Sequence, residues 1–424
     1  MKVYLRTFGC RANQYDSEAV RAMVEGAGGA VVATPAEADV AVFNSCAVTA
    51  EAEADLRQQL RRAGRANARL TSVVMGCAAA LPRAAATLRE LPTVRHVVGG
   101  ADLDGVAGAL GLPPAAAVRT GAQTGARALL RIQDGCDEHC TFCATTLARG
   151  ANRSRPAAEL VDEARALAAR HPEIVLTGVH IGTYGADAGT SLGALVERLV
   201  RDVPAVRFRL SSIEATEVDE RLRELLRGDP LRVAPYLHAP LQSGADRVLR
   251  RMGRHWYTAA GYAAAVERVV DGAAVFGLGA DLIAGFPGET EEEHRATLAL
   301  VERLPFTGLH VFPYSVRPGT AAERLPGRLD GATVARRARE LRDAARRLAA
   351  AYALRRAGGE ADVVVVGEGD RRTGLTEDYL SVSLAEPAPP RGSRWRGRLR
   401  AGAAGGADVR LAAAPLSPPV RSRP

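Results

Sequence analysis

The placement of six cysteines constrains this 424-residue chain more than any other feature of its sequence. Three of them, Cys136, Cys140 and Cys143, have the spacing C-x3-C-x2-C. Thiolates this close together are typical of a [4Fe–4S] cluster, in which each iron prefers one side-chain ligand. Because no fourth cysteine lies nearby, one iron would stay open to another ligand. A zinc site or a purely structural cluster is the alternative, although zinc sites usually combine paired C-x2–4-C units and four ligands.

The other three cysteines are far apart in the sequence but share a position relative to predicted strands. Cys10, Cys46 and Cys77 each follow an apolar, strand-like run by one to three residues. The carboxyl ends of neighbouring parallel strands converge on one edge of a sheet. Taken singly, each cysteine could be a small buried apolar residue. Together they account for every remaining cysteine, and we therefore predict a second [4Fe–4S] cluster, again with one iron that lacks a protein ligand.

Short apolar runs alternate with helical patterns in residues 1–115, which predicts a small parallel α/β N-terminal domain. Residues 125–356 repeat this alternation six times, which indicates a partial (β/α)6 barrel with its chemistry at the carboxyl ends of the strands. The expected strands of the two regions are Val3–Phe8, Val40–Phe43, Val73–Met75, His96–Val98, Leu129–Gln133, Ile174–Thr177, Arg207–Ser211, Tyr236–Ala239, Phe276–Ile283 and Leu309–Tyr314. A Gly/Ala/Pro-rich linker should join the regions, and a helix at Ala332–Arg356 should close the second.

Residues 360–424 predict only a short β segment, at Val363–Val366 and Tyr379–Leu384, followed by a Pro/Gly/Ala/Arg-rich tail that we do not expect to be well ordered. From residue 391 onward the chain has eight arginines and one aspartate, so the tail holds most of the net charge of +8. Two interpretations stay open. The tail could contact a phosphate backbone, or it could be a solvated end.

The chain has no apolar stretch of about 18 residues, and its N-terminus lacks the apolar core of a signal peptide. We therefore expect no membrane span and a location in the reducing cytoplasm. In that compartment cysteines serve metals or catalysis more often than disulfides.

Residues 1–385 resemble the radical-SAM methylthiotransferase family. The run DGCDEHCTFC, with Phe142 before its last cysteine, is similar to the family hallmark. The segments TFGCRANQYDSE, NSCAVTAEAE and MGCAA resemble the family's auxiliary-cluster domain. The run GLTEDYLSVSL faintly resembles the small TRAM-like, RNA-binding β-barrel that ends these proteins, in a short and degraded form.

Three further phrases, LTGVHIGTYG, RLSSIEATEV and HVFPYSVRPGTAA, look most like one branch of the family. The resemblance implies transfer of a methylthio group to carbon 2 of N6-threonylcarbamoyladenosine at position 37 of tRNA. The alternatives within the family are isopentenyladenosine in tRNA and an aspartate of a ribosomal protein. A different class of protein, an iron–sulfur electron carrier or RNA-binding protein without enzymatic activity, is the remaining alternative.

The resemblance also implies the roles of the cofactors. The catalytic cluster at Cys136, Cys140 and Cys143 would bind S-adenosylmethionine (SAM) at its open iron and, once reduced, cleave it to a 5′-deoxyadenosyl radical. The cluster at Cys10, Cys46 and Cys77 would hold the sulfur that is transferred. One SAM would methylate that sulfur and a second would generate the radical. The implied partners are tRNA, a low-potential electron donor of the ferredoxin or flavodoxin type, and a sulfur donor.

Candidate SAM contacts follow the barrel strands, where glycines would let the backbone approach a nucleoside closely. They are Phe142, Thr177, Gly178, Ser212, Glu214, Gln242, Arg254, Gly285 and Pro287. Arg254 could meet the SAM carboxylate, whereas the GFPGE run that contains Gly285 is by itself an ordinary turn signal. Arg149 beside the first cysteine cluster could contact RNA phosphates or be a solvated loop residue. His238 and His310 are interpreted as packed or hydrogen-bonded barrel residues, with open roles.

Overall fold

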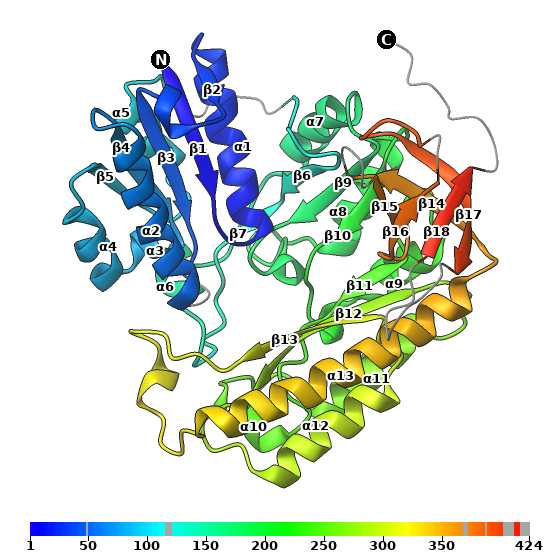
Figure 1. Ribbon diagram of the computed structural model, residues 1–424. Coiled ribbons are helices and arrows are strands. Elements are labelled where there is room, and N and C mark those ends of the chain that lie inside the picture. The colour runs from blue at the N-terminus through cyan, green and yellow to red at the C-terminus, as the bar shows by residue number, and fades with distance from the viewer. Residues whose placement is uncertain (48–49, 115–120, 368–371, 386–387, 402–410, 416–424) are drawn as a thin grey trace.

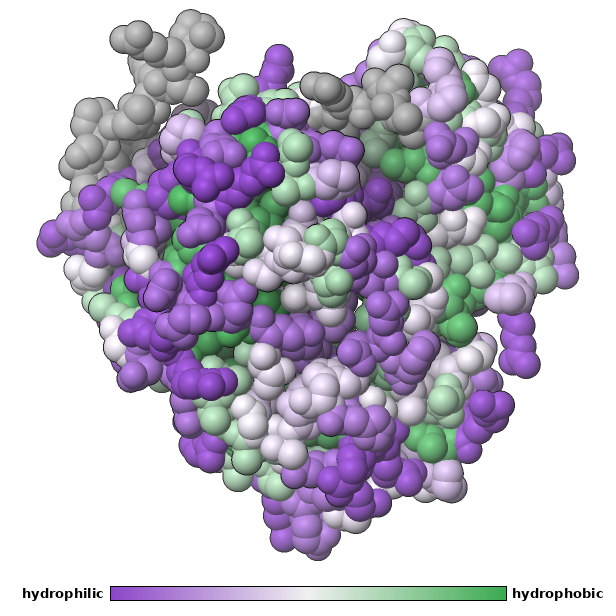
Figure 2. Space-filling view, turned by 180° about the vertical axis from the view of Figure 1, so that it is seen from behind, coloured by the Kyte–Doolittle hydropathy of each residue, from purple (hydrophilic) through white to green (hydrophobic). Residues whose placement is uncertain are grey.

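The computed structural model describes residues 1–47, 50–114, 121–367, 372–385, 388–401 and 411–415. Figure 1 shows three regions in chain order: a blue parallel sheet with helices, a green-to-yellow row of strands backed by helices, and an orange-to-red β-barrel. The expected fold class is confirmed. None of the helices in the described ranges is both long enough and apolar enough to span a membrane. On the face shown in Figure 2, most of the described surface is hydrophilic.

The N-terminal sheet has five parallel strands in the order β2-β1-β3-β4-β5. They are β1 (Lys2–Thr7), β2 (Ala30–Val32), β3 (Val40–Ser45), β4 (Thr71–Gly76) and β5 (Val94–Gly99). Helices α1 (Arg11–Gly26) and α5 (Leu103–Leu110) pack on one face, and α2 (Ala50–Ala66) and α4 (Pro82–Arg89) pack on the other. Covered on both faces, β3 is apolar almost throughout, which is why the sequence shows it as a continuous run. The short edge strand β2 was not predicted.

The second region is a partial barrel of six parallel strands. They are β6 (Ala128–Arg131), β9 (Glu173–Thr177), β10 (Arg207–Leu210), β11 (Tyr236–His238), β12 (Gly277–Ala284) and β13 (Gly308–Pro313). Ladders join β6-β9-β10 and β11-β12-β13, and bridges at Phe208–Val233 and Ser212–His238 connect the two groups. All six lie within a few residues of their predicted positions. The outer helices are α7 (Ala157–Ala168), α8 (Leu192–Asp202), α9 (Glu220–Arg227), α10 (Asp246–Arg251), α11 (Ala259–Val270), α12 (Glu291–Arg303) and α13 (Gly331–Arg356).

The C-terminal region differs from the sequence prediction. It forms a closed barrel, whereas only a short β segment was expected. Its strands are β14 (Glu360–Val365), β15 (Thr373–Thr376), β16 (Ser381–Leu384), β17 (Arg394–Ala401) and β18 (Leu411–Pro415). Strand β17 lies in the tail that was expected to lack order. It alternates buried Trp395 and Leu399 with exposed arginines, and this alternation is hard to recognise in so arginine-rich a sequence. The rest of the predicted tail, residues 402–410 and 416–424, lies outside the described residues.

A buried ion network attaches the C-terminal barrel to the partial barrel. Glu173 on β9 is fully buried, and its carboxylate lies 2.6 Å from Arg207 Nε and 2.8 Å from Arg209 Nε. Arg207 also contacts the Asp362 carboxylate of β14 at 2.6 Å. Burying charges is tolerated only when they are paired in this way. The network therefore fixes how the two barrels sit against each other.

Candidate functional site

The ends of three neighbouring strands bring Cys10, Cys46 and Cys77 to one edge of the N-terminal sheet. Cys10 follows β1, Cys46 follows β3, and Cys77 begins the short helix α3 (Cys77–Ala80) after β4. Strands β1, β3 and β4 are adjacent in the sheet, so their carboxyl ends meet. The charges of Cys10 and Cys46 both act on the Cys77 thiol, which places the three within electrostatic reach of one another.

Buried Asn13 organises this edge from the first turn of α1. Its side-chain nitrogen donates to the Ser45 carbonyl at 2.7 Å and to Asn44 Oδ1 at 3.0 Å. Its side-chain oxygen lies 3.6 Å from the Cys10 sulfur and 4.0 Å from the Cys77 sulfur. One amide thus ties the end of β3 to two of the thiols. The sequence motif contained Asn13, but nothing in its spacing signalled this role.

Two glycines with left-handed backbone precede the thiols. Gly9 has φ +95°, and a Cβ atom there would lie 2.7 Å from both the Cβ and the sulfur of Cys46. Gly76 has φ +94°, and a Cβ there would lie 2.5 Å from the Ser45 carbonyl oxygen. Both conformations are costly for any residue with a side chain. The close packing of Cys46 therefore depends on glycine at position 9.

The loop after the two-residue strand β7 (Gln133–Asp134) holds the first set of cysteines, Cys136, Cys140 and Cys143. The Cys136 sulfur is 3.6 Å from His180 Nδ1, and His180 Nε2 is 2.9 Å from the Glu217 carboxylate. The Cys140 sulfur lies 3.5 Å from Arg254 Nη1. Burial raises the pKa of the Cys140 thiol to about 12 and that of Cys77 to about 11. Both thiols would stay protonated until a metal displaces the proton.

The spacing of the thiols bears on the choice between zinc and a cluster. Among the described residues, only His238, Asp281 and His310 bring three potential ligand atoms within 4.8 Å of one another. Neither cysteine set is that compact. A single tetrahedral zinc, with each sulfur about 2.3 Å from the metal, needs its ligands closer together than this limit. A cubane cluster, whose sulfurs bind different irons, does not require the three ligand atoms to lie so close together.

A cavity of about 170 Å³ opens beside Cys136, Cys140 and Cys143. Five of the predicted SAM contacts line it, namely Phe142, Ser212, Glu214, Gln242 and Arg254. Gln242 has φ +64°, a strained backbone state that is often found at ligand sites. Glu214 is paired with Arg254 through one oxygen, and its Oε2 atom is buried with no hydrogen-bond partner among the described residues. A buried carboxylate oxygen in this state suits a hydroxyl or ammonium donor of a bound ligand.

The structure does not bring the other four predicted SAM contacts to this cavity. Buried Thr177 ends β9, and half-buried Gly178 follows it, where a Cβ would lie 2.7 Å from the Gln133 carbonyl oxygen. A Cβ on Gly285 would meet Val334 of α13 at 2.6 Å, and the Pro287 carbonyl accepts a hydrogen bond from Arg251 at 3.0 Å. The GFPGE run instead supports the site through Phe286, whose ring packs edge-to-face on Phe142.

Two arginines connect the two cysteine sets. Arg149, on α6 (Thr145–Arg149), is buried and pairs with Asp16 at 2.7 Å, and its positive charge acts on the Cys77 thiol. It is therefore not an exposed residue for RNA phosphates, as had been considered. Arg317 donates to the Phe142 carbonyl at 3.1 Å, and its charge interacts with both Cys143 and Cys46. Nothing in the sequence motifs singled out either bridging role.

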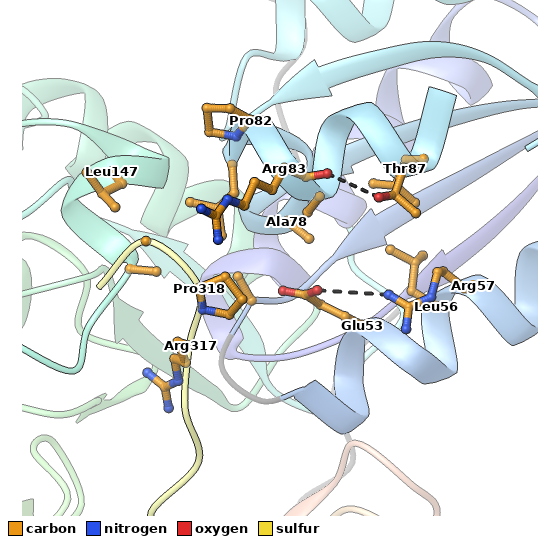
Figure 3. A pocket seen from close by; sticks show the side chains of 16 residues that line it. Glu53, Leu56, Arg57, Ala78, Pro82, Arg83, Thr87, Leu147, Arg317 and Pro318 are labelled. Atoms are coloured by element: carbon orange, nitrogen blue, oxygen red, sulfur yellow. Dashed lines mark hydrogen bonds and ion pairs between the residues drawn. The ribbon is translucent and has the colours of Figure 1, made fainter. Parts of the chain in front are cut away.

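A larger cavity of about 380 Å³ adjoins both sets (Figure 3). Ala47, Ala78 and Ala144, which each directly follow a cysteine, contribute to its lining. Most of the wall is apolar, and Figure 3 shows Leu56 and Arg57 on α2, Pro82 and Arg83 on α4, and Arg317 on the facing loop. The cavity therefore lies beside the chain neighbours of Cys46, Cys77 and Cys143.

Comparisons with known proteins agree with this architecture. Residues 2–99 match the Uncharacterized protein family UPF0004, and residues 130–301 match the Radical SAM superfamily. Threonylcarbamoyladenosine tRNA methylthiotransferase MtaB from Thermotoga maritima is 35% identical, over 85% of this chain and 86% of its own. A tRNA-2-methylthio-N(6)-dimethylallyladenosine synthase from Jannaschia sp. is 34% identical, over 80% and 78%. The radical S-adenosylmethionine methyltransferase TsrM from Kitasatospora setae shares the fold, with a TM-score of 0.56, 16% identity and 76% coverage of each chain.

Proposed function

The chain belongs to the radical-SAM methylthiotransferase family, and we propose that it transfers a methylthio group to carbon 2 of N6-threonylcarbamoyladenosine at position 37 of tRNA. The relative from Thermotoga maritima, which is named for this nucleoside, supports the substrate. The geometry that carries the proposal is the meeting of two separate cysteine sets, bridged by Arg149 and Arg317. A radical generator and a sulfur carrier have to lie close together for such a transfer.

We assign one [4Fe–4S] cluster to Cys136, Cys140 and Cys143 and a second to Cys10, Cys46 and Cys77. When bound, the first cluster supplies the electron that cleaves SAM, and the second supplies the sulfur. Arg254 balances the negative charge at Cys140 and orients Glu214 toward the cavity. At the other set, Asn13 Oδ1 accepts hydrogen bonds from the Cys10 thiol and from Arg149, which holds this amide against the cysteines.

We also propose access routes for the remaining partners. The cavity beside Ala47, Ala78 and Ala144 would admit a small sulfur donor to the second site. The exposed arginines of β17, alternating with its buried residues, would contact tRNA phosphates. A low-potential donor of the ferredoxin or flavodoxin type would reduce the first cluster in the cytoplasm, where the tRNA is found.

Mass spectrometry of tRNA nucleosides from cells with and without the gene tests the proposed substrate. We expect the 2-methylthio derivative of threonylcarbamoyladenosine to disappear and its precursor to accumulate. Loss of the methylthio derivative of isopentenyladenosine instead would contradict the substrate and keep the chemistry. No change in any methylthio nucleoside would contradict tRNA as the substrate.

A further inference from the structure

A group of polar side chains in the partial barrel lies outside both cysteine sites. Asp281 on β12 accepts hydrogen bonds through one oxygen from two histidines, from His238 Nε2 at 3.0 Å and from His310 Nδ1 at 3.1 Å. The centroids of the two imidazole rings lie 5.3 Å apart. Tyr236 lies 3.2 Å from the other ring nitrogen of His238. The role of the two histidines, left open by the sequence, is thus to form a fixed unit around Asp281.

This group lies directly beside the predicted SAM cavity. The backbone N–H of Gln242 donates to the Asp281 carbonyl at 2.8 Å, and the backbone N–H of Ile213 donates to the His238 carbonyl at 3.0 Å. Gln242 and Ile213 both line the cavity. The group therefore lies one backbone hydrogen bond away from the place where SAM is expected to react.

The group also reaches the N-terminal region through aromatic side chains. The Tyr236 ring stacks on Tyr379 with centroids 4.5 Å apart, and Arg11 donates to the Tyr379 hydroxyl. Arg11 directly follows Cys10 in the sequence. Its charge acts on His310 and opposes protonation of that ring. A chain of contacts thus leads from the second cysteine set to His310.

His310 is the member of the group that faces solvent. Its side chain is 67% exposed, and its Nε2 atom has no hydrogen-bond partner among the described residues. On the same face of β13, Phe312 is 39% exposed and packs edge-on against the His310 ring. Asp281 raises the pKa of His310 by accepting a hydrogen bond from its Nδ1–H group. A largely exposed imidazole, held by a carboxylate and next to an apolar ring, suits a planar base that carries an anionic substituent.

We propose that His310 and Arg11 bind the carboxylate of the threonyl side chain on the target adenine. Asp281 and His238 hold the His310 ring in place, and Phe312 packs against the base. This assignment rests on the proposed function, because only a substrate that carries a carboxylate requires it. An isopentenyl group has no charge and would gain nothing from His310 and Arg11.

The test compares two synthetic anticodon stem–loop RNAs that differ at one group, the threonyl carboxylate or its amide. With wild-type enzyme, we expect kcat/KM for the acid to exceed that for the amide by roughly 10- to 100-fold, the range of a hydrogen bond to a charged group. His310→Gln should reduce this preference several-fold, mainly by raising KM for the acid, and Arg11 should retain the remainder. His96→Gln, at an exposed histidine on β5, is the matched control and should keep the preference. Iron content and SAM cleavage should be the same in all three proteins.

Three results would overturn the inference. An undiminished preference in His310→Gln would show that the ring does not contact the carboxylate. Equal weakening of both RNAs would mean that His310 contacts a backbone phosphate instead. A stoichiometric zinc ion that is lost in His310→Gln would make the group a metal site. Failure of the wild-type enzyme to methylthiolate either RNA would instead contradict the proposed function.

Discussion

The two cysteine sites are built in opposite ways. Cys136, Cys140 and Cys143 come from one loop, and their spacing alone identifies them in the sequence. Cys10, Cys46 and Cys77 come from three strand ends and meet only because β1, β3 and β4 are neighbours in the sheet. The first site is thus formed within a single loop, whereas the second depends on the fold of a whole domain. Substitutions should affect the two sites differently.

The largest contrast should come from the cysteines themselves. Cys140→Ala should abolish SAM cleavage, because it removes a ligand of the cluster that binds SAM. Cys46→Ala should leave SAM cleavage intact and abolish sulfur transfer. Chromatography of 5′-deoxyadenosine and mass spectrometry of the RNA measure the two activities. Equal loss of both activities in both variants would remove the distinction between the sites.

Arg149 tests the connection between the sites. Arg149→Ala should lower the free energy of unfolding by about 3 kcal/mol, the lower end for breaking a buried ion pair, because Asp16 keeps its contact with Arg131. Arg153→Ala is the matched control. The Arg153 side chain is 62% exposed, so its replacement should lower the free energy of unfolding by less than about 1 kcal/mol. Urea denaturation measures both, and similar values would contradict the structural role of Arg149.

Gly9 tests the dependence of the second site on the fold. Gly9→Ala should cost about 1–3 kcal/mol and lower the iron held at Cys46, because the new methyl group would crowd that thiol. Gly28→Ala is the control, since Gly28 also has positive φ but has open space around it. Thermal unfolding and iron analysis separate the two effects. The same iron loss in both variants would show that backbone strain, and not crowding of Cys46, is responsible.

The smallest effect should come from the large cavity. Ala84 lines it, and Ala84→Trp should slow repeated turnover several-fold while leaving the first turnover unchanged. Ala86→Trp, on the exposed side of the same helix, should have no such effect. The amount of product per enzyme after the first turnover, compared with the amount after many turnovers, measures the difference. Unchanged repeated turnover in Ala84→Trp would rule out this route for the sulfur donor.

The sequence predicted the strands well where an apolar run is long and ends in a turn, as in β3 and β12. It also placed Ser212, Glu214, Gln242 and Arg254 near the first cysteine set. It failed for β17, since arginines at alternate positions were interpreted as a charged tail rather than as the outer face of a strand.

Contacts between side chains that are distant in the sequence could not be predicted either. Arg149 ends helix α6 and Arg317 lies in a distant loop, and the unit of His238, Asp281 and His310 comes from three strands. Side chains of this kind show no spacing pattern, because their partners are set by the order of strands and by the docking of two domains. Arg149 in particular was indistinguishable from the many solvated arginines of the chain.

Iron analysis of anaerobically reconstituted protein tests the central claim, that two clusters occupy two sites, most directly. The wild-type chain should hold about eight irons, since each cubane cluster contains four. Replacement of Cys10, Cys46 and Cys77 by alanine should leave about four irons and retain SAM cleavage. Replacement of Cys136, Cys140 and Cys143 should leave about four irons and no SAM cleavage. A wild-type chain with only about four irons would contradict the account.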